Sequence, residues 1–316
     1  MARFLVTGGA GFIGSNLVLA LARAGERVRV VDDLSFGSWD NLEGTDPDQV
    51  ERIAGDVRDA ELMARASTGV EVVFHEAAIG SVPISIDDPV RADSVNVGGT
   101  VTVLDAARRA GVRRVILAAS AAAYGDLPDL PKREDMPTAP LSPYAVSKLA
   151  AEQYMRVFAS LYGIETLSLR YFNVFGPHQR PDGAYAAAIP RFGWAALQGE
   201  PLIVFGDGGT TRDFCFIDNV VAANLAAAES PRRLGGEVVN IATGTQVSLN
   251  EVIAELGSVL GRKPAVVHSE PRPGDVRHSV ADIQRAREFL DYAPRMEWKQ
   301  GLAPTLEYLR SPGARS

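Results

Sequence analysis

The sequence predicts an α/β fold, in which a doubly wound parallel sheet is joined to a smaller, partly interleaved C-terminal region. Three observations indicate this class. Short apolar runs alternate with helical patterns over the first half of the chain, and a glycine-rich turn joins the first run to the first helix. The alternation ends near Phe175, and Gly and Pro are then frequent as far as Thr211. Regular alternation of strands and helices is typical of βαβ units, whose helices cover both faces of a parallel sheet.

The expected elements follow one another in chain order, and each strand is rich in β-branched or aromatic residues. A further strand at 238–242 is expected to return to the first sheet. We therefore expect a first domain over residues 1–173 that also takes in about 213–245, and a smaller region over 174–316. The predicted strands are 4–7, 28–31, 50–54, 72–75, 115–118 and 166–171, and the predicted helices are 12–24, 60–66, 90–110 and 143–162.

The composition argues against several classes of function. The 316 residues carry a net charge of −7 without a run of Lys and Arg, so we expect neither nucleic acid nor a membrane as a partner. A single cysteine, Cys215, and four scattered histidines provide neither a disulfide framework nor the spacing of a zinc site, so no metal is predicted. The first strand begins too early for a secretory leader, and no apolar stretch is long enough to span a membrane. These features predict a cytoplasmic protein.

A phosphate-binding turn is predicted between the first strand and the first helix. Gly8 permits the tight turn, Gly11 lets the backbone approach a pyrophosphate, and Gly14 allows close packing of the helix. The amides at the start of the helix then face the anion. A glycine-rich turn needed only for shape is the less favoured alternative. The predicted cofactor-binding residues of this turn are Gly8, Gly11, Phe12, Ile13 and Gly14.

An acidic residue at the end of the second strand indicates which dinucleotide is bound. Asp32 lies at about the distance from the turn at which an acid binds the adenosine ribose diol, and its charge would repel a 2′-phosphate. The sequence therefore predicts NAD rather than NADP, in a Rossmann-type domain. Asp33 is more simply a solvated turn residue. Asp56 and Val57 follow the third strand and are predicted to reach the adenine, although Asp56 equally suits a helix cap.

Tyr144 and Lys148 lie one helical turn apart on a predicted helix. Ser142 reads as the N-cap and Pro143 as the first helical residue, which places Tyr144 in the first turn. A neighbouring ammonium and the positive end of the helix dipole favour the phenolate, so we expect the pKa of Tyr144 to be lowered and the residue to act as a base. Taken alone, this spacing also occurs by chance on amphipathic helices.

These motifs together resemble the extended short-chain dehydrogenases/reductases, and within them the UDP-sugar 4-epimerases. The resemblance runs nearly end to end. It rests on residues 8–14, Asp32, 96–100, 120–125, Tyr144 with Lys148, 170–176, 206–208, 212–214 and 272–275.

The resemblance implies roles for single residues around the cofactor. Lys148 would hold the nicotinamide ribose, and Ser120 would bond the sugar hydroxyl and relay its proton to Tyr144. Ser120 also ends a strand at the edge where α/β sheets bind ligands. Ala77, Asn96 and Tyr171 are expected on the cofactor side. Without the family, Ser120 reads as a small strand-end hydroxyl and Asn96 as a polar residue inside a helix.

The resemblance assigns the UDP-sugar to the second region. Asn173, Arg212, Arg272 and Asp275 match positions that hold the diphosphate and the uridine ribose, and paired guanidinium groups suit phosphates. Surface salt bridges are the alternative explanation for these charges. Ser279 matches a position beside the sugar that tends to be large in enzymes limited to plain hexoses, so its small side chain predicts room for a 2-N-acetyl group. It equally reads as a small loop residue.

The implied reaction is a 4-epimerisation. Tyr144 would remove the proton of the sugar C4 hydroxyl as hydride passes to NAD, and the resulting 4-keto sugar would turn and take the hydride back. We expect UDP-GlcNAc/UDP-GalNAc and UDP-Glc/UDP-Gal as substrates. Alternatives are a 4-epimerase for plain hexoses only, a UDP-uronate epimerase or decarboxylase, and a non-catalytic NAD-binding scaffold. Dehydration is disfavoured, because Ala121 and Ala122 replace the acidic pair that it requires.

Two further expectations concern activity and assembly. Ala119, Ala121 and Ala122 flank Ser120 where the family commonly has Ser or Thr, which leaves the rate of proton relay in question. The helices at 90–110 and 143–162 resemble those of the family's dimer interface, a two-fold four-helix bundle. A homodimer is therefore expected, although the same apolar faces also suit packing on the sheet.

Overall fold

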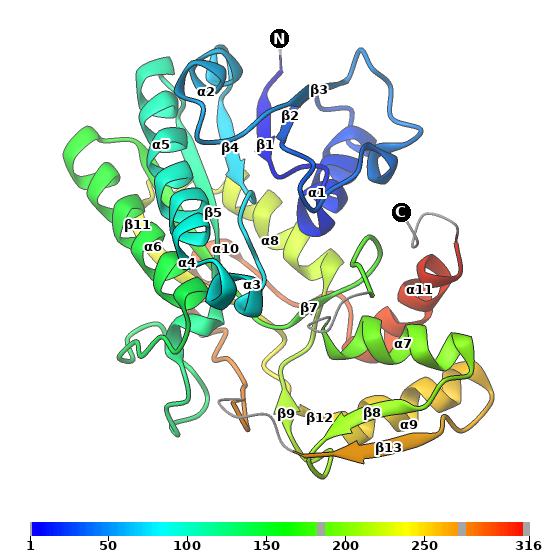
Figure 1. The fold of residues 1–316 in the computed structure, drawn as a ribbon. Helices are drawn as coiled ribbons and strands as arrows, with labels where there is room; N and C mark the ends of the chain where they lie inside the picture. Colours follow the sequence, from blue (N-terminus) through cyan, green and yellow to red (C-terminus); the bar gives the residue numbers. More distant parts are fainter. Residues whose placement is uncertain (1, 182–186, 271–275, 312–316) are drawn as a thin grey trace.

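Seven parallel strands form the central sheet of the computed structural model, which describes residues 2–181, 187–270 and 276–311. Their spatial order is β3-β2-β1-β4-β5-β6-β11, and all neighbours run parallel (Figure 1). The order reverses between β1 and β4, so a crevice opens there at the carboxyl ends of the strands. The strands are β1 Phe4–Thr7, β2 Val28–Asp32, β3 Val50–Ala54, β4 Val72–His75, β5 Arg114–Ser120, β6 Glu165–Tyr171 and β11 Gly235–Ile241.

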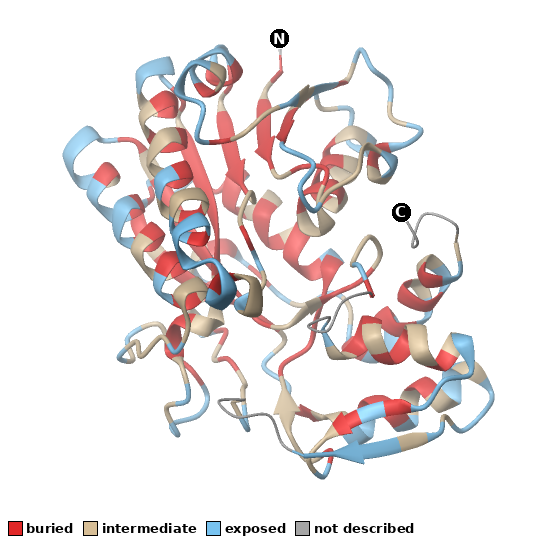
Figure 2. Cartoon of the chain, viewed as in Figure 1, coloured by how far each residue is buried: buried red, intermediate tan, exposed pale blue. Residues whose placement is uncertain are grey.

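Helices cover both faces of this sheet, which confirms the doubly wound α/β class. Alternate strand residues enter two cores: Phe4 and Val6 pack with α1 and α8, whereas Leu5 packs with α2, α5 and α6. Figure 2 shows the resulting buried strands between partly exposed helices. Burial on both faces explains why these strands read as nearly continuous apolar runs. The helices are α1 Phe12–Arg23, α2 Ala60–Ser67, α5 Gly99–Ala110, α6 Pro143–Tyr162 and α8 Ile217–Glu229.

The helix predicted over 90–110 is present, but it contains a π-helical turn that was not predicted. The structure has α4 Pro89–Asp93, a π-helical turn Ser94–Gly98 and then α5. A preceding helix, α3 Val82–Asp87, was not predicted, although Ser81 caps it by accepting a hydrogen bond from the amide of Ile84 at 3.3 Å. Single-turn π segments occur often at functional sites, and apolar periodicity alone does not reveal them.

The remaining segments form a smaller region below the sheet in Figure 1. The chain leaves the sheet after β6, returns for α8 and β11, and then leaves again. In the described part of the chain no helix is long and apolar enough to cross a membrane. The elements of this region are the strand pairs β7 Val174–Phe175 with β10 Cys215–Phe216, β8 Leu202–Phe205 with β13 Val266–Ser269 and β9 Thr211–Arg212 with β12 Val247–Ser248, and the helices α7 Ala188–Gln198, α9 Leu249–Leu260 and α11 Trp298–Arg310. The helix α10 Gln284–Leu290 instead packs against β11 and α8.

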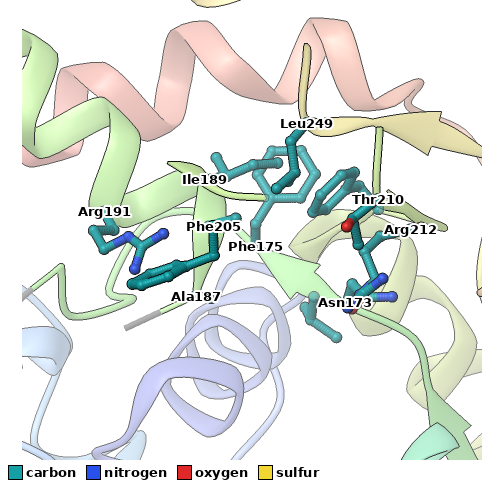
Figure 3. Close-up of a pocket in the computed structure, with 12 residues that line it drawn as sticks. Asn173, Phe175, Ala187, Ile189, Arg191, Phe205, Thr210, Arg212 and Leu249 are labelled. Atoms are coloured by element: carbon teal, nitrogen blue, oxygen red, sulfur yellow. The ribbon is translucent and has the colours of Figure 1, made fainter. Parts of the chain in front are cut away.

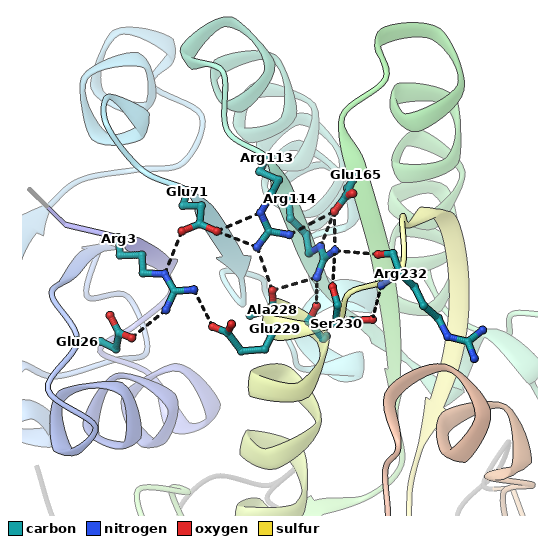
Figure 4. A network of polar contacts seen from close by, with 11 residues as sticks. Arg3, Glu26, Glu71, Arg113, Arg114, Glu165, Ala228, Glu229, Ser230 and Arg232 are labelled. Carbon is teal, nitrogen blue, oxygen red and sulfur yellow. Dashed lines mark hydrogen bonds and ion pairs between the residues drawn. The ribbon is translucent and has the colours of Figure 1, made fainter.

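A network of ion pairs and hydrogen bonds lies at the amino ends of the strands (Figure 4). Arg114, whose side chain is 1% exposed, binds Glu165 through Nε at 2.8 Å. The same guanidinium donates to the carbonyls of Ala227 and Ala228 at the end of α8, at 2.5 and 2.9 Å. The last carbonyls of a helix have no partner within it, so Arg114 satisfies acceptors that would otherwise be buried alone. It thereby fixes α8 against the sheet.

Candidate active site

A cleft of about 590 Å³ lies at the carboxyl ends of the strands, at the point where the strand order reverses. This is where open α/β sheets bind their ligands. The cleft brings together residues that are distant in the sequence, because each follows a different strand of one sheet. Among the predicted site residues, it is lined by Gly8, Gly11, Phe12, Ile13, Gly14, Asp32, Asp56, Val57, Ala77, Ser120, Tyr144, Lys148, Tyr171 and Asn173.

The glycine turn leaves no space for side chains. Gly8 has φ +68°, and a Cβ there would lie 2.6 Å from the amide nitrogen of Ala77, which follows β4. A Cβ on Gly14 would collide with the carbonyl of Gly8. The turn is therefore packed tightly against the end of β4, and backbone rather than side chains lines this part of the cleft. Such a surface suits a pyrophosphate.

Asp32 is 7% exposed at the end of β2 and accepts hydrogen bonds from the amides of Ala10 and Leu34, at 2.9 and 2.8 Å. Burial raises its pKa, and these amides oppose the shift. Asp56 is tied to Arg58 by its side chain, which lowers the pKa of the Asp56 carboxyl. The cap of α2 is Asp59, so capping does not explain Asp56.

Asn96 lies in the π-helical turn and is 2% exposed. Its Oδ1 accepts from the amide of Ile79 at 2.8 Å, and its Nδ2 donates to Ser147 Oγ at 2.9 Å. Ser147 in turn donates to the carbonyl of Tyr144 at 2.8 Å. Asn96 is not among the residues described as lining the cleft. The structure therefore gives it a supporting position between the loop after β4 and the first turn of α6.

Tyr144, Ser120 and Lys148 meet at one end of the cleft. Ser142 caps α6 by accepting from the amide of Ala145 at 3.2 Å, and Pro143 follows it, which confirms the predicted helix start. Ser120 ends β5, and its hydroxyl is a hydrogen-bonding partner of the Tyr144 phenol. Lys148 Nζ donates to the carbonyl of Ala118 at 2.7 Å. Two neighbouring elements thus hold a phenol, a hydroxyl and an amine together.

The expected lowering of the Tyr144 pKa is wrong. Burial raises the pKa of Tyr144, and the bond to Ser120 opposes that rise without reversing it. Burial also lowers the pKa of Lys148 to about 8. Two groups whose charged forms are disfavoured by burial are typical of sites that exchange protons.

Two residues that line the same cleft were not singled out from the sequence. Glu76 directly follows β4, and its Oε1 accepts from the Tyr171 hydroxyl at 2.9 Å. His178 has φ +68°, and its Nδ1 lies 2.7 Å from Ser15 Oγ on α1. The signal for Glu76 was its place at the carboxyl end of a buried strand. No local pattern marks His178, because its partners come from the first helix and from α11.

A second cavity of about 200 Å³ adjoins the cleft through Asn173 (Figure 3). Asn173 has φ +28°, and its Nδ2 donates to the carbonyl of Asp213 at 3.1 Å. Arg212 lines this cavity from β9, and Phe205 and Arg191 lie on the opposite side in the view. The cavity thus combines aromatic surface with guanidinium groups.

The other predicted substrate residues are placed differently. Ser279 lies beside β9, where its amide donates to the carbonyl of Thr211 at 3.2 Å, and among the described residues it is in the lining of neither cavity. Arg272 and Asp275 lie outside the described residues.

Comparison with known families decides the relationship of the chain. The model of the NAD dependent epimerase/dehydratase family matches residues 4–242, which include the sheet and the cleft. The chain belongs to this family. It is therefore an enzyme with NAD as its cofactor, and the packed glycine turn and the buried Asp32 fit that cofactor.

Individual members of the family are similar over almost the whole chain. The UDP-glucose 4-epimerase of Mycolicibacterium smegmatis is 41% identical, over 98% of this chain and 99% of the relative. The structure of UDP-glucose 4-epimerase from Thermotoga maritima with UDP-glucose has a TM-score of 0.91 at 38% identity, covering 97% and 98% of the two chains. The UDP-N-acetylglucosamine 4-epimerase from Methanobrevibacter ruminantium has a TM-score of 0.92 at 35% identity, covering 97% of each chain.

Other members of the family differ in the sugar named for them. A UDP-N-acetyl-alpha-D-glucosaminuronate decarboxylase of Bacillus cytotoxicus is 32% identical over 98% of both chains. The Thermus thermophilus UDP-glucose 4-epimerase, solved with NAD, has a TM-score of 0.88 at 34% identity, covering 98% and 99%. Similarity to the family as a whole therefore does not select one sugar.

Proposed function

We propose that the enzyme is a UDP-sugar 4-epimerase that interconverts UDP-GlcNAc with UDP-GalNAc and UDP-Glc with UDP-Gal. The observation that carries this proposal is the meeting of Tyr144, Ser120 and Lys148 at the end of a dinucleotide cleft. A base beside a nicotinamide site suits the oxidation of an alcohol. The adjoining cavity with Arg212 offers a separate site for the UDP group.

In this proposal each residue has one task. NAD, when bound, accepts the hydride of the sugar C4 and later returns it. Tyr144 takes the proton of the C4 hydroxyl, directly or through Ser120, and gives a proton back after the 4-keto sugar has turned. Lys148 is proposed to hold the cofactor ribose, and its ammonium group would offset part of the rise in the Tyr144 pKa that burial causes. Exchange of hydride in both directions leaves no net oxidation.

The two regions of the chain divide the binding work. Residues 1–173 with about 213–245 hold NAD, and residues 174–316 hold the nucleotide of the substrate. Asn173 lines both cavities, so it is placed to contact the substrate where the two regions join. Arg212, Arg272 and Asp275 are proposed to keep the UDP group fixed while the sugar turns.

The N-acetylated sugar is proposed because Ser279 is small and lies next to the strand that carries Arg212. A serine there would leave space for a 2-N-acetyl group. A second candidate is a UDP-uronate epimerase or decarboxylase, which the decarboxylase among the relatives favours.

The test is incubation of the purified enzyme with UDP-GlcNAc, UDP-Glc and UDP-GlcA separately, with products identified and copurified NAD measured. Conversion of the first two substrates to their C4 epimers supports the proposal. Conversion of UDP-GlcA alone would replace it with the uronate activity. Bound NAD with no product from any of the three would overturn the proposed reaction.

We also propose a homodimer in which α6 and the helical segment at 90–110 form a two-fold four-helix bundle. Val146, Tyr154, Val157 and Leu161 are exposed on α6, and their spacing places them on one face. An exposed apolar stripe on a surface helix is typical of a protein interface. Leu161→Arg is expected to yield monomers in sedimentation velocity, with Lys299→Ala on α11, away from both helices, as the control. A wild-type protein that sediments as a monomer at micromolar concentration would contradict the dimer.

A further inference from the structure

Glu76 is a carboxyl group at the centre of the cleft, and the proposed reaction gives it no task. It follows β4, which lies between the strand of the glycine turn and the strand that ends in Ser120. Its Oε1 accepts from Tyr171, and the Tyr171 hydroxyl accepts from Asn224 Nδ2 at 2.8 Å. Three elements thus fix the orientation of one carboxylate.

The other carboxylate oxygen is left without a partner. Oε2 of Glu76 is shielded from solvent and has no hydrogen-bond partner among the described residues, although the residue lines the cleft. Buried polar atoms in native proteins are nearly always hydrogen-bonded, so an orphaned one requires an explanation. A positively charged group in the cleft would compensate this carboxylate through its charge, without a hydrogen bond to Oε2.

The groups that face Glu76 leave its charge only partly compensated. Lys148 on α6 is the nearby cation, and burial lowers the pKa of Lys148 to about 8. Tyr144 on α6 and Tyr171 on β6 are phenols whose pKa values burial raises, so both are neutral. His75 precedes Glu76 on β4 but points to the other face of the sheet, where its ring pairs with Thr7 and Thr100. Burial raises the pKa of Glu76 to about 7, with the bond from Tyr171 and the charge of Lys148 opposing the rise.

We propose that Glu76 sets the redox balance of the bound NAD by favouring its oxidised form. The oxidised nicotinamide ring is positively charged and the reduced ring is neutral. Reduction adds two electrons and one proton and so removes the ring charge. A carboxylate held at the Tyr144 end of the cleft attracts only the oxidised form. The inference rests on the proposed function only in placing the nicotinamide beside Tyr144.

Favouring the oxidised form serves an enzyme that returns its hydride in every turnover. If the keto sugar escapes before the hydride is returned, the reduced cofactor remains and the enzyme is inactive. A charge that disfavours the reduced form makes this loss less frequent. In a partly buried site, one charge a few ångströms away changes such an equilibrium by about tenfold or more.

The test measures the reduction potential of bound NAD in the holoenzyme without any sugar. The enzyme is equilibrated with a dye of known potential, and the absorbance of the reduced nicotinamide is read. Glu76→Gln keeps the acceptor for Tyr171 and removes the charge. We expect it to raise the ratio of reduced to oxidised NAD by about tenfold at pH 8 and equal dye potential. Glu71→Gln removes the same charge at the other end of β4 and is the matched control.

The pH dependence of the wild type gives a second measurement that requires no variant. Reduction of NAD raises the proton affinity of Glu76, so the potential of the wild type falls more steeply with pH around neutrality than that of Glu76→Gln. Equal potentials in wild type and Glu76→Gln, or an equal shift in Glu71→Gln, would overturn the proposal. Because no sugar is present, a failed epimerase assay leaves this result intact.

Discussion

Charged side chains are paired at the amino ends of the central sheet and only partly paired at the carboxyl ends. At the amino ends, Glu71 pairs with Arg3 at 3.0 Å and with Arg113 at 2.9 Å. Glu76 lies at the other end of β4, five residues after Glu71. It lines the cleft, and its Oε2 has no hydrogen-bond partner among the described residues. At the amino ends, ion pairs compensate the charged side chains for their lost hydration. At the carboxyl ends, some charged side chains are only partly paired.

The difference separates stability from function within one sheet. Paired charges and satisfied carbonyls around Arg114 hold α8 in place. Uncompensated burial around Tyr144, Lys148 and Glu76 shifts their pKa values and leaves groups free to bind or exchange protons. Substitutions at the two ends should therefore affect different measurements.

The largest effect is expected from Tyr144→Phe. Removing the phenol removes the proposed proton acceptor and should lower kcat by about 10²- to 10⁴-fold. The free energy of unfolding should fall by only about 1 kcal/mol, because one neutral hydrogen bond, to Ser120, is lost. The measurement is turnover of the preferred UDP-sugar together with urea unfolding. Tyr162→Phe, at the exposed end of the same helix, is the control and should retain full activity. Full turnover by Tyr144→Phe would exclude this residue as the base.

Arg114→Met tests the opposite edge. It leaves Glu165 and the carbonyls at the end of α8 without their buried donor, and it should lower the free energy of unfolding by about 3 kcal/mol. Turnover by the folded protein should stay near that of the wild type. Urea unfolding at fixed NAD concentration measures the change, since bound cofactor adds to stability.

Arg109→Met is the matched control for that experiment. Arg109 pairs with Asp105 one turn away on α5, with its side chain 68% exposed, so its loss should change stability by no more than about 0.5 kcal/mol. If Arg114→Met were as stable as Arg109→Met, the amino edge would not have the stabilising role assigned to it.

The sequence predicted the features that depend on local spacing and missed those that depend on contacts between distant segments. The turn at Gly8, the acid at Asp32 and the pair Tyr144 and Lys148 were predicted, because each depends on local spacing and on the end of one strand. The environment of Glu76 was not predicted, since its partners Tyr171 and Asn224 come from β6 and α8. The pKa of Tyr144 was predicted in the wrong direction, because spacing reveals a neighbouring charge but not the burial that raises this pKa.

The free energy of unfolding should depend on pH through Glu76, and comparison with Glu76→Gln measures this dependence. Its pKa is about 7 in the folded protein, above the ordinary 4.5, so between these values the folded state binds more protons than the unfolded state. The contribution of Glu76 to the free energy of unfolding is therefore fully present below about pH 4.5, and it is lost as the pH rises through 7. Relative to Glu76→Gln, the NAD-free wild type should lose about 3 kcal/mol over that range.

His75 changes stability in the opposite direction, and comparison with the variant removes its effect. Its pKa falls to about 3, so its contribution is present above about pH 6.5 and is lost as pH falls. It is common to the wild type and Glu76→Gln and cancels in the difference between their unfolding free energies. Parallel stability curves for the two proteins would show that Glu76 titrates normally.

The smallest effect is expected from Ser279→Tyr. This substitution tests whether sugar selection can be changed without changing the binding of NAD. A large side chain beside β9 should lower kcat/KM for UDP-GlcNAc by about tenfold and leave UDP-Glc nearly unchanged, because a pocket excludes an added group mainly by size. Ser279→Ala keeps the volume and should alter neither substrate. Copurified NAD should be equal in all three proteins, since Ser279 lies outside the cofactor cleft as described. Equal losses for both sugars would mean that the tyrosine disturbs the position of Arg212, and size selection at residue 279 would then be wrong.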